Sequence, residues 1–174
     1  MPEPSHTQTP YRGGWVRVDV EEWPGIGSYE VVRRHDAAAV LALTPEGDVL
    51  LVRQFRPPVR QHLTEIPAGL LDVEGEDALA CASRELLEET GFRHETIEFL
   101  GGFYSSAGST DEYVHLFWAT TAATAEGEPE AGIELLKIPF ERMVAAARSG
   151  KVRDAKTAIA LLLAPGHIGE TGGT

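Results

Sequence analysis

Hydrophobic and polar residues alternate along several short segments of the chain, which is the pattern of β-strands. Val16, Val18 and Val20 alternate with polar neighbours in WVRVDVEEW, and YEVVRRH is a second candidate strand. Two apolar runs, AAAVLAL and VLLVRQF, flank the segment TPEGD and predict two buried strands joined by a turn. Further strands are expected at IEFLGGFY, EYVHLFWAT and IELLKI.

Apolar residues at helical spacing predict three helices. The first runs from Asp77 to Thr90 and is followed by Gly91, a helix stop. The others are FERMVAAARSG, which ends at Gly150, and DAKTAIALLLA, in which Asp154 is the expected N-cap. Strands and helices mix without strict alternation, so the sequence predicts an α/β protein with a mixed sheet and helices on its faces.

The first helix carries three carboxylates within one turn. At about 100° per residue, Glu85 and Glu89 lie side by side at the edge of the apolar stripe, while Glu88 points away toward Arg84. The stripe expected to pack on the sheet consists of Leu79, Ala82, Ser83 and Leu86, with Leu87 at its margin.

Neighbouring like charges on a helix repel, and partial burial strengthens the repulsion. A hard divalent cation such as Mg²⁺, which takes carboxylate oxygens as ligands, would relieve it. An isolated acidic turn is more often a solvated helix face. The preceding loop EIPAGLLDVEGE favours the metal site, because a Gly-rich loop that enters a helix offers backbone groups to a ligand.

Composition and charge narrow the classes of function. The 174 residues, 43% of them hydrophobic, suffice for one domain with a core. A formal net charge of −12 argues against a nucleic-acid partner, whereas a bound cation would still admit a small anionic substrate. Cys81 is the only cysteine, which excludes an intramolecular disulfide and a thiolate cluster.

The ends of the chain are polar and predict no membrane partner. No apolar run approaches about 18 residues, and MPEPSHTQTP lacks the apolar segment of a secretory signal. We therefore expect a cytoplasmic protein with flexible tails at residues 1–14 and 166–174.

One long motif resembles a known family. Gly69, Glu76 and the segment RELLEETGF from Arg84 to Phe92 resemble the Nudix box, G-x5-E-x7-R-E-U-x-E-E-x-G-U, where U is apolar. Every position of the second half matches, and six rather than five residues separate Gly69 from Glu76, which indicates a one-residue insertion in the loop. VLLVRQFRPPV, LTEIPAGLL and GKVRDAKTAIALLLA are similar to the ADP-ribose pyrophosphatase branch, over about residues 15–165.

The resemblance implies a fold and an activity. The fold is an α/β/α sandwich with a mixed β-sheet between helices and antiparallel strands at the N-terminus. The activity is hydrolysis of the pyrophosphate bond of ADP-ribose or a related nucleoside diphosphate sugar. Residues 35–165 would form the Nudix domain, and residues 15–34 would mediate a homodimer. Trp15 and Trp23 would pack there or stack on a base.

The resemblance also assigns metal ligands. Glu85 and Glu89 match ligands for Mg²⁺, for which Mn²⁺ is a possible substitute, and the carbonyl of Ala68 is the expected backbone ligand. Glu88 would bind a further metal or serve only as the partner of Arg84.

Substrate contacts and the general base complete the expected site. Arg53 and Arg56 would reach the diphosphate, and Gly69 would let the loop approach the helix. Ala107 stands where the ADP-ribose branch has a proline, which leaves another nucleoside diphosphate sugar open as substrate. The resemblance also implies that the general base comes from the loop EGEPEAGIE, where Glu130 is ranked ahead of Glu128 and Glu134.

Two other classes of function remain open. A nucleotide-sensing module on the same fold usually lacks box carboxylates, and this chain retains them. A diphosphate isomerase on the same fold would need an acid–base pair such as a cysteine and a glutamate. Cys81, one turn before Glu85, is expected to face away from the core stripe and is a weak candidate.

Overall fold

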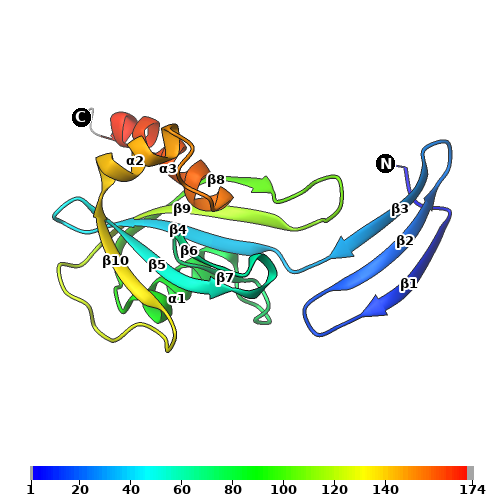
Figure 1. Ribbon diagram of the computed structural model, residues 1–174, viewed down its shortest axis with the longest axis horizontal. Helices are drawn as coiled ribbons and strands as arrows, with labels where there is room; N and C mark the ends of the chain where they lie inside the picture. Colours follow the sequence, from blue (N-terminus) through cyan, green and yellow to red (C-terminus); the bar gives the residue numbers. More distant parts are fainter. Residues whose placement is uncertain (1, 172–174) are drawn as a thin grey trace.

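The computed structural model describes residues 2–171 (Figure 1). Its elements are, in chain order, β1 (His6–Arg12), β2 (Arg17–Trp23), β3 (Gly27–Arg33), β4 (Ala37–Leu43), β5 (Asp48–Arg56), the 3₁₀ helix η1 (Pro57–Val59), β6 (Gln61–Glu65), β7 (Ala68–Leu70), α1 (Ala78–Thr90), β8 (His94–Tyr104), β9 (Tyr113–Thr121), β10 (Glu134–Pro139), α2 (Phe140–Arg148) and α3 (Ala155–Thr171).

Seven strands form the mixed main sheet, in the order β10-β5-β4-β9-β8, with β6 beside β5 and β7 beside β4. Strands β4 and β9 are parallel, and the other pairs are antiparallel. Strand β4 pairs with β5 only at Leu43↔Val49, because β7 occupies the same edge of β4 at residues 37–39. This arrangement inserts the Gly-rich segment into the sheet above α1.

Helices cover both faces of this sheet: α1 packs on one face and α2 and α3 on the other (Figure 1). Along β4, Ala38 and Val40 contact the cluster that contains α1, whereas Ala39 and Leu41 contact the cluster that contains α2 and α3. A strand buried on both faces reads as a continuous apolar run, which explains AAAVLAL. The predicted α/β/α layering is confirmed.

Helix α1 has the predicted ends but not the predicted buried face. Asp77 caps it by accepting a hydrogen bond of 2.8 Å from the N–H of Ala80, and Gly91 ends it in a left-handed conformation. Leu79, expected in the core, is 44% exposed, whereas Cys81 is fully buried. The reason is that β7 lies against the Cys81 side of the helix, where the thiol faces the backbone carbonyls of the Gly-rich segment.

The N-terminal residues form a separate three-stranded antiparallel sheet, β1-β2-β3, which extends away from the main body (Figure 1). Residues 6–12 of the expected flexible tail are therefore a strand, paired with β2 from His6↔Glu22 to Arg12↔Arg17. Periodicity did not predict β1 because all seven of its residues are exposed.

At the other end of the chain, α3 continues through Thr171, so the tail expected at residues 166–174 is helical up to that point. The remainder of that expected tail lies outside the described residues. Within the described part of the chain, no helix is long and apolar enough to cross a membrane.

Candidate active site

Glu89 is a buried carboxylate in the last turn of α1. It is 6% exposed, and its oxygens accept hydrogen bonds from the N–H of Ala68 at 3.0 Å and from the side chain of Gln54 at 3.4 Å. No ion pair among the described residues includes it. Burial raises the pKa of Glu89 to about 7; the charge of Glu85 adds to the shift, and the Ala68 N–H opposes it.

Glu85 lies one turn earlier on α1, directly beneath Gly69. A Cβ atom built on Gly69 would lie only 1.8 Å from Oε1 of Glu85, so this carboxylate occupies the space that any larger residue would fill. Burial raises the pKa of Glu85, with Glu88 and Glu130 adding to the shift and Arg84 opposing it. The expected close approach of the Gly-rich loop to the helix is therefore present.

Arg84 forms ion pairs with three carboxylates of the motif. It donates two hydrogen bonds to Glu76, at 2.8 and 3.0 Å, and its Nη1 donates to Glu85 at 2.6 Å and to Glu88 at 3.0 Å. Glu76 thus holds the loop on the helix through Arg84. The Glu88 side chain is 51% exposed. The predicted pairing of Glu88 with Arg84 is present.

The donor set fits a divalent cation at the pair Glu85 and Glu89. Both carboxylates have raised pKa values because burial disfavours their charge, and a hard cation with oxygen ligands would reverse that effect. Within residues 2–171 no group of three or more His, Cys, Asp or Glu side chains converges into a complete metal site. The two glutamates would therefore need backbone oxygens or water to complete a coordination sphere.

A cleft of about 490 Å³ is lined by Ala68 and Gly69, the residues that lie next to Glu89 and Glu85, whereas the two carboxylates themselves do not line it. Its charged lining residues are the cations Arg34, Arg56 and Lys156 and the carboxylates Glu65, Glu112 and Asp154. Arg56 and Lys156 are the cations that we expect to suit a diphosphate, whereas Arg34 is paired with Glu112. Lys156 was not predicted from the sequence.

Glu65 holds both of these cations. Its carboxylate is 2% exposed, accepts two hydrogen bonds of 2.8 Å from Arg56 and is also bonded to Lys156. Lys156 also donates to Asp154 at 3.0 Å, and Asp154 caps α3 through the N–H of Thr157 at 2.9 Å. Burial disfavours the charge of Glu65, but the two cations outweigh burial and lower its pKa to about 2.

The acidic loop after β9 is tied by its backbone to the end of α1. The N–H of Glu130 donates to the carbonyl of Glu88 at 3.0 Å, and the N–H of Glu126 donates to the carbonyl of Gly91 at 2.7 Å. A Cβ atom on Gly91 would lie 2.1 Å from the carbonyl oxygen of Gly127. Glu130 is thereby placed beside the helix that carries Glu85 and Glu89.

Two other expected contact residues lie outside the cleft. Arg53 pairs with Glu134 at 2.9 Å on the surface of β5 and β10, so both are already partnered. Ala107 lines a hollow formed with Trp23, Ile26 and other residues of the N-terminal sheet. Within one chain, neither Arg53 nor Ala107 lines the cleft that contains Arg56.

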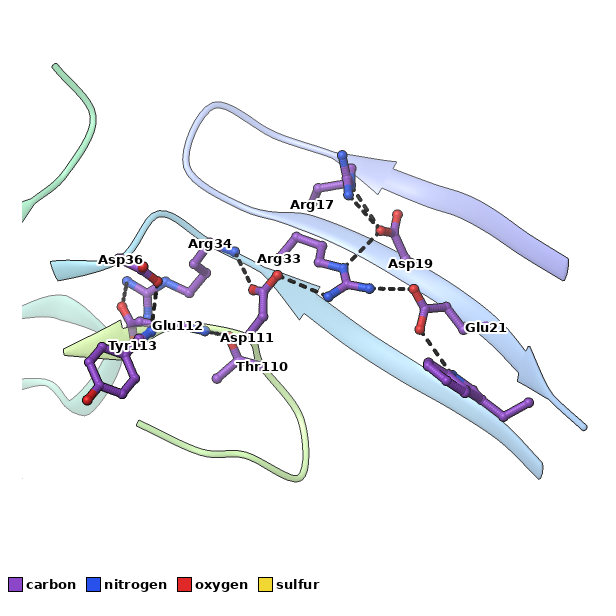
Figure 2. A network of polar contacts seen from close by, with 11 residues as sticks. Arg17, Asp19, Glu21, Arg33, Arg34, Asp36, Thr110, Asp111, Glu112 and Tyr113 are labelled. Carbon is purple, nitrogen blue, oxygen red and sulfur yellow. Dashed lines mark hydrogen bonds and ion pairs between the residues drawn. The ribbon is translucent and has the colours of Figure 1, made fainter. Parts of the chain in front are cut away.

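Ion pairs join the N-terminal sheet to the loop after β8 (Figure 2). Arg33 contacts Asp19 and Glu21 within the sheet and Asp111 of the loop, the last at 3.0 Å. The backbone N–H of Arg34 donates to the other oxygen of Asp111 at 3.2 Å. The loop that carries Ala107 is thus held by the N-terminal sheet.

Comparisons with known proteins identify the family of this chain. The model of the NUDIX domain matches residues 33–160, and the chain belongs to this family. It is 39% identical over 136 residues to an ADP-ribose pyrophosphatase of Bacillus subtilis (strain 168), covering 76% of this chain and 73% of the relative.

Two further comparisons concern a relative named for a different substrate and a solved structure of the same fold. The chain is 33% identical over 150 residues to a GDP-mannose pyrophosphatase of Yersinia enterocolitica, covering 79% of this chain and 78% of the relative. The crystal structure of an ADP compounds hydrolase superposes with a TM-score of 0.80 at 20% identity, over 99% of this chain and 97% of that one. This last likeness shows that the fold is shared.

Gly69→Ala tests the close approach of the loop to Glu85. The added Cβ meets the end of a flexible side chain, so we expect Glu85 to swing away while the fold and melting temperature stay nearly unchanged. A misplacement of about 1 Å costs on the order of a hundredfold in rate, and we expect such a loss of metal-dependent hydrolysis. Gly14→Ala is the control, because a Cβ there meets nothing within 4 Å. Equal rates for both variants would remove Glu85 from the site.

Proposed function

We propose that the protein hydrolyses the pyrophosphate bond of ADP-ribose or a related nucleoside diphosphate sugar, with Mg²⁺ as cofactor. The observation that carries the proposal is the pair of carboxylates Glu85 and Glu89, whose charge burial disfavours, next to Gly69 and Ala68 of a cleft that Arg56 and Lys156 also line. The names of the two relatives support this class of substrate.

We assign the carboxylates of the site to metal binding and its cations to diphosphate binding. Glu85 and Glu89 would hold the metal, with the Ala68 carbonyl beside them and Glu88 as a further ligand if it leaves Arg84. Divalent cations bound there would neutralise the diphosphate and lower the pKa of an attacking water. Arg56 and Lys156 would bind the diphosphate oxygens, and because Glu65 fixes both side chains, the site is organised before substrate arrives.

Glu130 is our proposed general base. Its backbone bond to Glu88 places it beside α1, and its charge contributes to the raised pKa of Glu85. Glu134 is paired with Arg53, which makes it the weaker candidate. A carboxylate in this loop would need to come within hydrogen-bond reach of the water when substrate is bound.

A hydrolysis panel tests the proposal. The purified protein would be incubated with Mg²⁺, Mn²⁺ or EDTA and with ADP-ribose, GDP-mannose, UDP-glucose, a diadenosine polyphosphate or 8-oxo-dGTP. Chromatography of the products would detect a nucleoside monophosphate and a sugar phosphate. Metal-dependent cleavage of ADP-ribose or GDP-mannose supports the proposal and ranks the substrates. No cleavage of any compound, with metal binding retained, would favour a nucleotide-sensing module.

The structure gives little support to an isomerase. Such an enzyme would require a titratable acid–base partner near the carboxylates. The Cys81 thiol is fully buried, contrary to expectation, and burial raises its pKa to about 12.

We also propose that the protein is a homodimer that uses its N-terminal sheet. The buried side chains of β2 are the carboxylates of Asp19 and Glu21, so this sheet has no apolar core of its own. Four large side chains at its surface are 45–69% exposed: Tyr11, Trp15, Ile26 and Tyr29. A small sheet with exposed apolar residues gains stability by packing against another surface. A second copy packed there would also contribute residues to the hollow that Ala107 lines.

The dimer proposal predicts the effect of one added charge. Ile26→Arg is expected to convert the protein to a monomer and to raise KM, because the charge would be buried in the interface. Light scattering after gel filtration measures the mass. Leu162→Arg on α3, which is also about half exposed, is the control and should leave the mass unchanged. A monomeric wild-type protein with full activity would show that the site is built within one chain.

A further inference from the structure

A second cleft, of about 820 Å³, lies away from the carboxylate pair, between β6 and α2. Its size is typical of small-molecule sites, which occupy about 300–1,000 Å³. Three cationic side chains line it: Arg142 from α2, and Lys151 and Arg153 from the segment before α3. The proposed function does not use these residues.

The charge of this cleft is unusual for the chain. The protein has 27 acidic and 15 basic residues, yet no Asp or Glu lines the cleft. None of the ion pairs formed within residues 2–171 includes Arg142, Lys151 or Arg153. Elsewhere in this acidic protein, arginines are commonly paired; Arg33, Arg56 and Arg84 each contact at least one carboxylate. The cleft therefore holds three positive charges that no described carboxylate neutralises.

The remaining lining is partly apolar. Leu63 of β6, Met143 of α2 and Val152 contribute hydrophobic surface, and His62 contributes a further polar ring. A ligand that satisfies both features carries an anionic group together with a compact apolar or planar part. Guanidinium groups match phosphate oxygens particularly well, because each can donate two parallel hydrogen bonds.

We propose that this cleft binds a small phosphomonoester that bears an apolar or planar group, at a site distinct from the substrate cleft. Leu63 lines both clefts, and the segment Lys151–Arg153 leads directly into Asp154 and Lys156 of the substrate cleft. A ligand bound by Arg142 and Arg153 would therefore adjoin the residues that fix the cations of the proposed active site. The proposal does not depend on the proposed reaction.

Calorimetric titration of the wild-type protein in EDTA tests it, with AMP, inorganic phosphate and adenosine as probes. We expect AMP and phosphate to bind and adenosine not to bind. In Arg142→Gln/Arg153→Gln, AMP affinity should fall by about tenfold or more, because two charge-assisted contacts are lost. Arg12→Gln/Arg148→Gln removes the same charge from arginines outside the cleft and should bind AMP as the wild type does.

Amide chemical shifts locate the site without relying on a variant. AMP should perturb residues 61–64 and 142–153 of the wild-type protein. Shifts confined to the substrate cleft, equal affinity in both double variants, or no binding of AMP and phosphate at millimolar concentration would each overturn the proposal. Arg56→Gln separates the two sites: it should impair hydrolysis but leave AMP binding in EDTA unchanged.

Discussion

Replacing Glu89 by glutamine is expected to lower kcat by at least about a hundredfold while leaving the protein folded. Changes to residues that merely orient metal ligands already cost about 10–100-fold, and Glu89 is itself a proposed ligand. Glutamine keeps an oxygen that accepts the Ala68 N–H but carries no charge. Because burial already disfavours the charge of Glu89, the free energy of unfolding at pH 7 should not fall.

Two measurements separate this loss from a folding defect. Steady-state kinetics over a range of Mg²⁺ concentrations should show weakened activation, and thermal unfolding in EDTA should show a melting temperature at or above that of the wild type. Glu95→Gln, at an exposed position of β8, is the matched control and should retain activity. Near-normal turnover of Glu89→Gln would exclude this carboxylate from the metal site.

Glu65→Gln is expected to have the largest effect on stability. The change leaves Arg56 and Lys156 without their shared anion, and breaking a buried ion pair costs about 3–5 kcal/mol. We expect the lower end, about 3 kcal/mol, because the Arg56 side chain is 38% exposed. KM for the nucleotide substrate should also rise, because both cations would lose their fixed positions in the cleft. Denaturant unfolding measures the first effect and initial-rate kinetics the second.

The difference in unfolding free energy between the wild type and Glu65→Gln should depend on pH in a defined direction. The folded protein lowers the pKa of Glu65 from 4.5 to about 2, so ionised Glu65 stabilises the fold above pH 4.5. Its contribution is lost as the pH falls through that window toward 2. The gap in unfolding free energy between wild type and Glu65→Gln should therefore narrow below pH 4.5.

The control variant, Glu134→Gln, removes a solvent-exposed partner of Arg53 and should cost less than about 1 kcal/mol of unfolding free energy. A similar cost for both substitutions would contradict a special role for Glu65.

The sequence predicted those elements whose periodicity reports burial. Strand β4, buried on both faces, and helix α1, with its Asp77 cap and terminal Gly91, have the expected positions. Strand β1 escaped prediction because backbone pairing, not burial, defines it. The sequence predicts a loop where the short strand β7 lies, because the pairing of β7 with β4 joins residues about thirty positions apart along the chain.

The residues of the candidate site likewise fall into those that a local sequence motif predicts and those that meet only in the folded chain. Glu85, Glu88 and Glu89 were predicted because one helical motif places them, and Gly69 because the motif extends into the loop. Glu65 and Lys156 are separated by 91 positions and meet only in the folded chain, so no local pattern indicated their contact. Which face of α1 is buried, with Cys81 inside and Leu79 exposed, likewise depends on where β7 lies.

The attachment of the acidic loop to α1 has an implication for divergence among relatives. Glu126 and Glu130 are held there through backbone N–H groups, and the contact of Gly91 with Gly127 involves no side chain. Substitutions at the other loop positions can therefore change which acidic side chains lie near the end of α1 without releasing the loop. In directed evolution, randomising the loop outside Gly91 and Gly127 should yield folded libraries, whereas alanine at Gly91 should force the loop off the helix.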